Sequence, residues 1–316
     1  MKDFLMRLKL TYSVYNFFHR KQLIHNEIVY KKLNLKKKYY SPISSKDFVG
    51  LPGNVDTYPE LASKAALEHC KVYKELSVSD QKSLSEFNEK GYAILSRYLS
   101  DKQVDEINDE IKQLLKKKRV KPLRNNKIMF AIHASPLLRH IANNEKLREV
   151  LSALLGGNAI LFQSINFTMG SEQASHSDSI HMTTFPLGGL LGVWIALEDI
   201  SEDNGPLHYY PGSHKLPYYL NAEYNNEGNS FLIGDKSYTE YENMINGKIT
   251  SLGLKKEIFK AKKGDLLIWH ANLFHGGEPH LDKTKTRKSM VLHYFREGSV
   301  CYHEIKQRPA LIKQIS

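Results

Sequence analysis

Cysteine is almost absent from this sequence, whose 316 residues include two, Cys70 and Cys301. Two cysteines cannot build a disulfide framework, and neither belongs to a Cys-x-x-Cys or a Cys/His zinc spacing. Long apolar runs are also absent, so we expect no transmembrane helix. The amino terminus, MKDFLMRLKL, interrupts its apolar residues with Lys and Arg, unlike the continuous apolar run of a signal peptide. These absences predict a reducing compartment, and we expect a cytoplasmic protein with at most peripheral membrane contact.

The composition is that of a globular protein, with 41% apolar, 25% charged and 10% aromatic residues. The length allows either two domains or one barrel with extensions. We predict a basic N-terminal extension over residues 1–75 and one main domain over residues 76–316.

The positive charge is concentrated near the amino terminus. Residues 1–50 contain eleven Lys and Arg and three Asp and Glu, a net +8 of the total +11. Apolar residues recur among these cations at roughly helical spacing. This pattern fits an arm that clasps the main domain or a second subunit, and it also fits a helix that contacts an anionic membrane or an acidic glycan. Nucleic acid is disfavoured, because no nucleic-acid-binding motif accompanies the charge.

Periodicity predicts helices first and strands afterwards. Helices are expected over residues 79–90, 101–118 and 136–155, and a strand over 91–99. From residue 159 onward, short apolar runs alternate with turn signals, which is typical of a sandwich or barrel. We therefore predict a mainly β fold with flanking helices. Residues 218–250 are polar and weakly periodic, and we expect a long lid-like loop there.

Two His-x-Asp triplets could contribute to a metal site. His176 and Asp178 would point to the same side of an extended strand and offer one nitrogen and one oxygen. His280 and Asp282 lie in a Lys-rich turn, where side chains are usually solvated, so we set that pair aside. Two histidines and one carboxylate form the facial triad that binds Fe(II), and the strongest candidate for the second histidine is His275, which two glycines follow.

An arginine follows the last of these histidines by twelve residues. Arg287 begins the strand KSMVLHYF, and inside a barrel its guanidinium would need an anion such as a carboxylate. The alternative is a surface arginine on an edge strand. His270, five residues before His275, is expected to face away from the site.

The order of these motifs resembles a known family. The segments HSD, VWIALEDISEDNGPLHYYPGSH, KKGDLLIWHANLFHGG and RKSMVLHY follow one another as in the phytanoyl-CoA dioxygenase family of Fe(II)- and 2-oxoglutarate-dependent oxygenases. The resemblance covers about residues 85–300. It implies a double-stranded β-helix, a jelly-roll or cupin-like barrel, with His176, Asp178 and His275 as iron ligands and Arg287 holding the distal carboxylate of 2-oxoglutarate.

Other residues are implied by the same resemblance. Trp194 matches a tryptophan that lines the co-substrate pocket, and Lys127 matches a basic co-substrate contact. Gln163 and Asn166 could contact co-substrate or substrate, or simply satisfy strand ends. Some relatives place a serine two residues after the distal histidine, where this chain has Gly277.

The expected reaction is oxidation of a substrate C–H bond by O2 with conversion of 2-oxoglutarate to succinate and CO2. Halogenating relatives replace the carboxylate ligand with a small residue. Asp178 therefore favours hydroxylation, or desaturation or ring chemistry. His181, Thr183 and Thr184 could line a polar pocket for a small hydrophilic metabolite or for one linked to a carrier or a glycan.

Two non-enzymatic functions stay open beside the oxygenase. One is a metal-binding β-barrel without turnover, and the other is a basic-arm binding protein with a vestigial site. The sequence does not decide whether the chain forms an oligomer.

Overall fold

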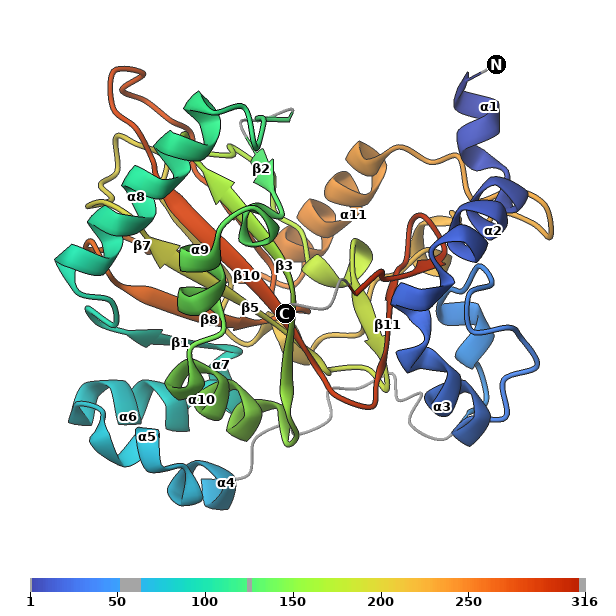
Figure 1. The fold of residues 1–316 in the computed structure, drawn as a ribbon, viewed down its shortest axis with the longest axis horizontal. Coiled ribbons are helices and arrows are strands. Elements are labelled where there is room, and N and C mark those ends of the chain that lie inside the picture. The colour runs from blue at the N-terminus through green and yellow to red at the C-terminus, as the bar shows by residue number, and fades with distance from the viewer. Residues whose placement is uncertain (1, 52–63, 124–126, 313–316) are drawn as a thin grey trace.

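A six-stranded antiparallel sheet forms the centre of the computed structural model, which describes residues 2–51, 64–123 and 127–312 (Figure 1). Its strand order is β1-β8-β5-β10-β3-β2. In chain order the strands are β1 (Tyr92–Leu95), β2 (Lys127–Met129), β3 (Ala159–Phe167), β5 (Leu190–Ala196), β8 (Leu266–His270) and β10 (Ser289–Arg296).

A second antiparallel sheet has the order β7-β6-β9 and consists of β6 (Leu207–Tyr209), β7 (Glu257–Phe259) and β9 (His275–Gly277). A bridge between His176 and His275 adds one more extended segment beside β9. The strands thus alternate between two antiparallel sheets, as in a jelly roll. The predicted mainly β fold with flanking helices is confirmed, and among the described residues the two sheets do not close into a continuous barrel.

Successive side chains along the central strands point to opposite faces of the main sheet and so belong to two separate hydrophobic cores. On β5, Val193 and Ile195 pack with the helical layer, whereas Trp194 packs among residues of the second sheet such as Leu207 and Phe259. The helical layer comprises α8 (Asp101–Lys116), α9 (Pro136–Ala142) and α10 (Glu145–Leu155), which cover one face of the main sheet (Figure 1). The other face is therefore left for the cavity between the sheets.

The helices confirm one prediction and correct two others. Helix α8 begins at the expected place, where Ser100 and Gln103 form a capping box. The helix predicted over 136–155 is wrong as one piece, because the side chain of Asn144 accepts a hydrogen bond from Leu147 N–H and starts α10 anew. The helix predicted over 79–90 is likewise two, α6 (Val78–Ser85) and α7 (Phe87–Lys90), which follow α4 (Lys64–His69) and α5 (Lys71–Glu75).

The segment 218–250 is not a long loop throughout. Helix α11 (Tyr238–Ser251) occupies its second half and begins with a capping box between Ser237 and Glu240. The helix buries only Tyr241 and Ile245, so its apolar stripe is too narrow to stand out in the sequence. The helix lies between the main sheet and the amino-terminal helices (Figure 1).

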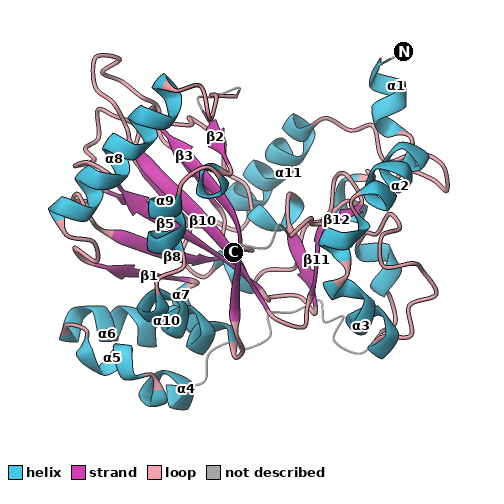
Figure 2. Cartoon of the chain, in the orientation of Figure 1, coloured by secondary structure: helices cyan, strands magenta, loops and turns pink. Residues whose placement is uncertain are grey.

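Residues 2–51 form the amino-terminal arm, which packs through side chains such as Val29, Ile43 and Phe48 on a third sheet, of order β12-β11-β4 (Figure 2). They form α1 (Lys2–Arg7), α2 (Lys9–Phe18) and α3 (His25–Lys32). The sheet consists of β4 (Thr183–Phe185), β11 (Val300–His303) and β12 (Arg308–Pro309). Phe48 stacks on Phe185 with 4.3 Å between ring centroids and lies 5.3 Å from Tyr302. The arm thus joins the main domain, while the domain boundary at residue 75 stays a prediction.

Candidate membrane-spanning helices were sought among the described residues, and none is both long and apolar enough to cross a bilayer.

Two phenylalanines of the arm test this packing. Phe48 is 1% exposed and Phe18 is 75% exposed. We expect Phe48→Ala to lower the free energy of unfolding by about 3–5 kcal/mol, because it opens a cavity between three aromatic rings. Phe18→Ala should change it by less than about 0.5 kcal/mol. Denaturant unfolding of both variants measures the difference, and equal midpoints would contradict an arm that folds with the rest of the chain.

Candidate metal and co-substrate site

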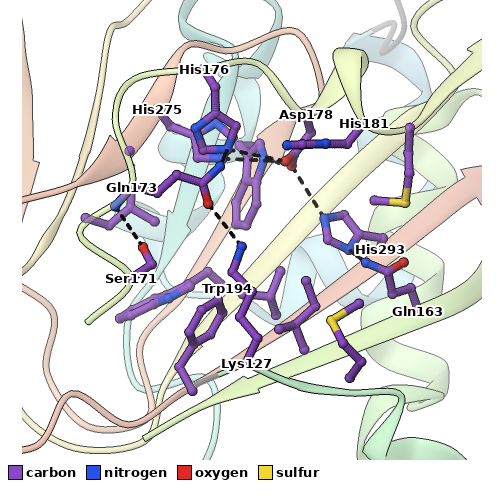
Figure 3. A pocket seen from close by; sticks show the side chains of 18 of the residues that line it. Lys127, Gln163, Ser171, Gln173, His176, Asp178, His181, Trp194, His275 and His293 are labelled. Carbon is purple, nitrogen blue, oxygen red and sulfur yellow. Dashed lines mark hydrogen bonds and ion pairs between the residues drawn. The ribbon is translucent and has the colours of Figure 1, made fainter. Parts of the chain in front are cut away.

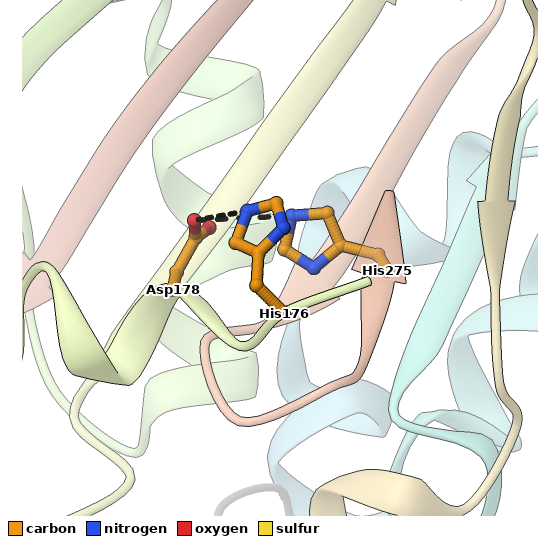
Figure 4. Close-up of side chains that lie close together, drawn as sticks. All are labelled: His176, Asp178 and His275. Carbon is orange, nitrogen blue, oxygen red and sulfur yellow. Dashed lines mark ion pairs between the residues drawn. The ribbon is translucent and has the colours of Figure 1, made fainter. Parts of the chain in front are cut away.

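Two histidines and one aspartate converge at the open end of the second sheet (Figure 4). His275 begins β9, and His176 lies beside it in the bridge, with a 2.9 Å hydrogen bond from His176 N–H to His275 C=O. Asp178 does not lie on an extended strand, as the sequence suggested, but begins a short 3-10 helix, Asp178–Ile180. The turn still brings its carboxyl oxygen Oδ1 to 3.8 Å from Nε2 of each histidine.

Backbone carbonyls orient both imidazoles. Nδ1 of His176 lies 2.8 Å from Ala174 C=O, and Nδ1 of His275 lies 2.9 Å from Leu273 C=O. A carbonyl can only accept, so Nδ1 carries the proton and donates in both rings. The lone pairs of the two Nε2 atoms therefore face the shared space. This is how proteins commonly prepare histidines to bind a metal.

The two oxygens of Asp178 have different surroundings. Oδ2 accepts a 2.9 Å hydrogen bond from Trp269 Nε1–H and lies 3.4 Å from Nε2 of His293. The side chain of Gln163 approaches the other nitrogen of that ring at 3.4 Å. Oδ1 faces the two metal-facing imidazoles at a distance too long for a hydrogen bond. One oxygen is thus held by the protein and the other is free to bind an ion.

Protonation states fit the same picture. Burial lowers the pKa of His176 well below its usual value, so this imidazole is neutral at physiological pH. Burial raises the pKa of the Asp178 carboxyl, but the interactions with His275 and with His293 outweigh it and hold that pKa well below its usual range. A neutral imidazole beside a carboxylate is the combination that a metal requires.

Arg287 is buried in the same cavity, and no acidic side chain of the described residues forms an ion pair with it. One of its Nη atoms donates a 2.9 Å hydrogen bond to Ser289 Oγ, and its Nε has no hydrogen-bond partner among the described residues. Its guanidinium carbon lies 5.5 Å from the ring centroid of Phe167 and 5.7 Å from that of Trp194. Burial lowers the pKa of Arg287 to about 10, which still leaves the group charged near neutral pH. A buried, incompletely paired cation of this kind is suited to an anionic ligand.

A second cation reaches the metal-facing histidines through an amide. Lys127 Nζ donates to Gln173 Oε1 at 3.1 Å (Figure 3). Gln173 Nε2 donates to Tyr238 Oη at 3.1 Å. The same amide nitrogen lies 3.2 Å from Nε2 of His176. Burial lowers the pKa of Lys127. Gln173 therefore connects β2, helix α11 and a metal-facing imidazole.

All these groups line one cavity of about 330 Å³ between the two sheets. Of the residues predicted from sequence, the cavity wall includes His176, Asp178, His275, Arg287, Lys127, Trp194, Gln163 and His181. The roles assigned to them stay predictions, but the fold brings them to one place.

Three predicted substrate residues lie elsewhere. Asn166 is on β3 between Ile165 and Phe167, and because those neighbours face the cavity, it points to the opposite side of the sheet. The hydroxyl of Thr184 donates to Pro186 C=O and accepts from Gly189 N–H. Thr183 is buried on β4, paired with β11, and is likewise not part of the cavity wall that the described residues form.

The sequence interpretation overlooked Gln173, Trp269, His293, Tyr238 and Ser171. Trp269 and His293 each lie two residues after an apolar strand residue, Leu267 and Val291, and therefore point to the same face as that residue. This spacing is a weak signal that they face inward. A Cβ at Gly192 would lie 2.3 Å from the Trp269 ring, so a glycine is needed on the neighbouring strand for that ring to reach Asp178. Gln173 and Tyr238 come from irregular segments and a helix end, where no periodicity could identify them.

Comparison with known proteins agrees with this architecture. Residues 87–289 match the family model for phytanoyl-CoA dioxygenase (PhyH). The phytanoyl-CoA dioxygenase domain-containing protein 1 of Danio rerio is 37% identical over 94 residues, which cover 28% of this chain and 32% of that protein. A phytanoyl-CoA dioxygenase of Arabidopsis thaliana is 29% identical over 184 residues, 56% of this chain and 59% of that one. The match to the zebrafish protein thus spans about a third of its length.

Solved structures show the same fold at low sequence identity. The non-heme α-ketoglutarate-dependent carbocyclase SnoK of nogalamycin biosynthesis matches with a TM-score of 0.62 at 17% identity, over 77% of this chain and 96% of that one. EctD from S. alaskensis, solved with 2-oxoglutarate and 5-hydroxyectoine, matches with a TM-score of 0.59 at 18% identity, over 88% and 95%. These likenesses support the fold, and the family match covers well over half of the chain. The chain belongs to the phytanoyl-CoA dioxygenase family.

Proposed function

We propose that this protein is an Fe(II)- and 2-oxoglutarate-dependent oxygenase that hydroxylates a C–H bond of a small polar metabolite. One observation carries the proposal: two imidazole nitrogens, one free carboxylate oxygen and a buried arginine that forms no ion pair with a described acidic side chain line the same cavity. A metal site alone would not need the arginine, and an anion site alone would not need the three metal-facing donors.

The donor set fits iron. Two imidazoles and one carboxylate leave three adjacent coordination positions open, which is the arrangement of non-heme Fe(II) oxygenases. When bound there, Fe(II) would supply the activation of O2, coupling conversion of 2-oxoglutarate to succinate and CO2 with transfer of one oxygen atom to a substrate C–H bond. His176, Asp178 and His275 would hold the ion, and Trp269 and His293 would keep Asp178 turned so that Oδ1 points to it.

The rest of the cavity suits a short dicarboxylate. Arg287 would bind the distal carboxylate with its planar fork, while the faces of Phe167 and Trp194 hold the guanidinium in place. Lys127 adds a second positive charge to the same cavity. Ile165, Leu207 and Val291 line the wall between these polar groups and exclude water. Exclusion of water strengthens the charge interaction that orients the co-substrate.

Ser171 places a hydroxyl close to Gly277, which has no side chain. A Cβ at Gly277 would lie 2.9 Å from Ser171 Oγ, so Ser171 occupies the space that a serine at 277 would use. Ser171 lines the cavity. We infer that Ser171 donates to the co-substrate carboxylate in place of the serine that some relatives have.

The substrate end of the cavity is rich in imidazoles. His181, His293 and His303 line it together with Met182 and Gln163. The imidazole N–H groups and the Gln163 amide can donate hydrogen bonds to a hydroxyl or carboxylate of a substrate. The cavity of about 330 Å³ must also hold the co-substrate, so only a small part of a larger molecule would fit. This supports a small polar metabolite, with any carrier or glycan to which it is linked remaining outside.

Formation of the ternary complex tests the proposal. Anaerobic addition of Fe(II) and then 2-oxoglutarate to metal-free protein should produce the weak visible absorption of a chelated keto acid. His176→Ala should abolish this absorption, because it removes one of three protein ligands. His19→Ala, on the arm, should leave it unchanged. Absorption of equal strength in the His176→Ala variant would contradict the assignment of this histidine.

Loss of the arginine should weaken co-substrate binding specifically. Loss of a buried charge-assisted pair costs about 2–4 kcal/mol, so Arg287→Ala should raise the 2-oxoglutarate concentration for half-saturation by roughly 30- to 1,000-fold. Binding of Fe(II) alone, measured by calorimetry with Mn(II) as an oxygen-stable substitute, should change little. Arg296→Ala, at the end of β10, is the matched control. An unchanged 2-oxoglutarate affinity in Arg287→Ala would rule out the clamp.

A serine exchange tests the replacement hydroxyl. Ser171→Ala should raise the half-saturating 2-oxoglutarate concentration by about 3- to 10-fold, as loss of one hydrogen bond of roughly 1 kcal/mol predicts. Combining Ser171→Gly with Gly277→Ser should restore most of the affinity, because the hydroxyl returns from the neighbouring backbone. If Ser171→Ala binds 2-oxoglutarate as well as the unaltered protein does, the inference fails while the Arg287 clamp stands.

Oxygenase activity itself separates this proposal from a non-catalytic barrel. Candidate metabolites can be screened for succinate release that depends on the substrate, together with a mass gain of one oxygen in the substrate. A protein that binds Fe(II) and 2-oxoglutarate but releases no succinate above the uncoupled rate with any of a broad panel would favour the non-catalytic alternative.

A further inference from the structure

Helix α2 turns its apolar side chains away from the protein. Leu10, Val14, Phe17 and Phe18 are all exposed, and the buried side chains of this helix are Tyr12 and Asn16. The Asn16 amide is used inside the arm, where its Nδ2 donates to Tyr40 C=O at 3.0 Å. A surface helix normally buries its apolar stripe, so this helix is amphipathic in the reverse sense.

The exposed apolar surface continues beyond α2. Ile24 and Ile28 are 52% and 65% exposed in the next turns of the chain. Phe231, which is 77% exposed, comes from a distant segment, yet its carbonyl accepts a 2.9 Å hydrogen bond from Lys9 N–H at the start of α2. Single exposed apolar residues are ordinary, but a grouping of this size indicates an interaction surface. We call the set Leu10, Val14, Phe17, Phe18, Ile24, Ile28 and Phe231 the apolar arm face.

Cations are interleaved with this face. The Arg20 guanidinium lies 4.4 Å from the Phe17 ring centroid, and the Lys38 ammonium lies 5.9 Å from that of Tyr40. The Phe17 and Tyr40 rings are themselves 5.8 Å apart. Further exposed lysines of the arm are Lys21, Lys31, Lys32, Lys36 and Lys37.

Acidic side chains do little to offset these cations. Within residues 5–51, the acids are Glu27 and Asp47. Glu27 pairs with Lys31 at 3.0 Å, and Asp47 pairs with Lys37 at 2.7 Å. The surface is therefore both apolar and strongly positive.

We propose that the apolar arm face docks on the surface of an anionic lipid membrane. Exposed aromatic and aliphatic side chains can enter the boundary between headgroups and acyl chains, and neighbouring lysines and arginines can pair with lipid phosphates. A second copy of this chain fits less well, because apposed faces would bring two sets of cations together with few acids between them. Nucleic acid would use the cations but would give the aliphatic side chains no partner.

The position of the arm relates this surface to the site. Residues 229–235 are attached to the arm, with Ile233 N–H donating to Arg7 C=O at 2.9 Å and Arg7 pairing with Asp235 at 3.3 Å. These residues lead directly into α11, whose first residue, Tyr238, contacts Gln173. A membrane bound to the arm would therefore lie on the α11 side of the molecule (Figure 1).

Vesicle flotation tests the proposal on the full chain. The protein should bind vesicles that contain phosphatidylglycerol and should bind pure phosphatidylcholine vesicles far more weakly, and added salt should reduce the binding. The double variant Leu10→Ser with Phe18→Ser should need at least about tenfold more anionic lipid for half-binding. Leu281→Ser is the matched control, since Leu281 is 69% exposed but lies far along the chain from the arm. It should bind like the unaltered protein.

A charge variant makes the test independent of the apolar substitutions. Replacing Lys21, Lys32 and Lys36 by Gln should reduce the affinity for anionic vesicles by more than about tenfold. Replacing Lys102, Lys112 and Lys116 on α8 by Gln removes the same charge elsewhere and should have little effect. Unfolding midpoints of all variants should match that of the unaltered chain, because every substituted side chain is exposed.

Three results would overturn the proposal. They are no binding to anionic vesicles, binding unaffected by both arm variants, and a dimer in analytical ultracentrifugation that Leu10→Ser with Phe18→Ser dissociates while vesicles are not bound. The last result would assign the face to a second copy of the chain. None of these outcomes depends on the iron site, because 2-oxoglutarate binding can be measured separately in each variant.

Discussion

The two carboxylate oxygens of Asp178 have different surroundings, and the arrangement of the site depends on this difference. Oδ2 is held by Trp269 and approached by His293, so the carboxylate cannot rotate freely in the cavity. Oδ1 is left equidistant from two imidazole nitrogens whose protons are on their far sides. A buried carboxylate with one oxygen unpaired is costly unless a cation arrives. An iron ion bound beside Oδ1 would offset this cost.

Gln173 shows how closely the metal position and helix α11 are connected. Its amide nitrogen lies beside the lone pair of His176 Nε2 and also donates to Tyr238 at the start of α11. One lone pair cannot serve both an amide and a metal, so metal binding would free that N–H to turn elsewhere in the cavity. The same helix start is reached from the other side by residues 229–235, which the arm holds. The arm, helix α11 and the site are therefore connected by one continuous set of contacts.

The sequence predicted the parts of this structure that depend on local pattern. Strand β3 matches the run AILFQSINF from end to end, and the four residues of the proposed iron and co-substrate site come together as expected. Errors arose where tertiary structure overrides the pattern. Helix α11 was missed because it buries two residues only, although Ser237 and Glu240 carried a capping signal. Asn166 points away from the cavity because it lies on β3 between Ile165 and Phe167, which both line the cavity.

Residues that act through neighbours could not be found from sequence alone. His293 reaches Asp178 because β10 lies beside β5 and β3 in the main sheet, and that pairing joins segments that are distant in the sequence. Ser171 Oγ approaches Gly277 because the segment around residue 171 lies beside the end of β9, a contact that no periodicity encodes. In the arm, the sequence does show apolar residues at helical spacing. Only the structure shows that this apolar side faces outward.

The most direct test of the central claim is a crystal structure obtained anaerobically with Fe(II) and 2-oxoglutarate. The account predicts anomalous density about 2.0–2.2 Å from His176 Nε2, His275 Nε2 and Asp178 Oδ1, with the distal carboxylate of 2-oxoglutarate against Arg287. Iron bound elsewhere, an Asp178 carboxylate turned away from the ion, or a co-substrate that does not contact Arg287 would contradict it.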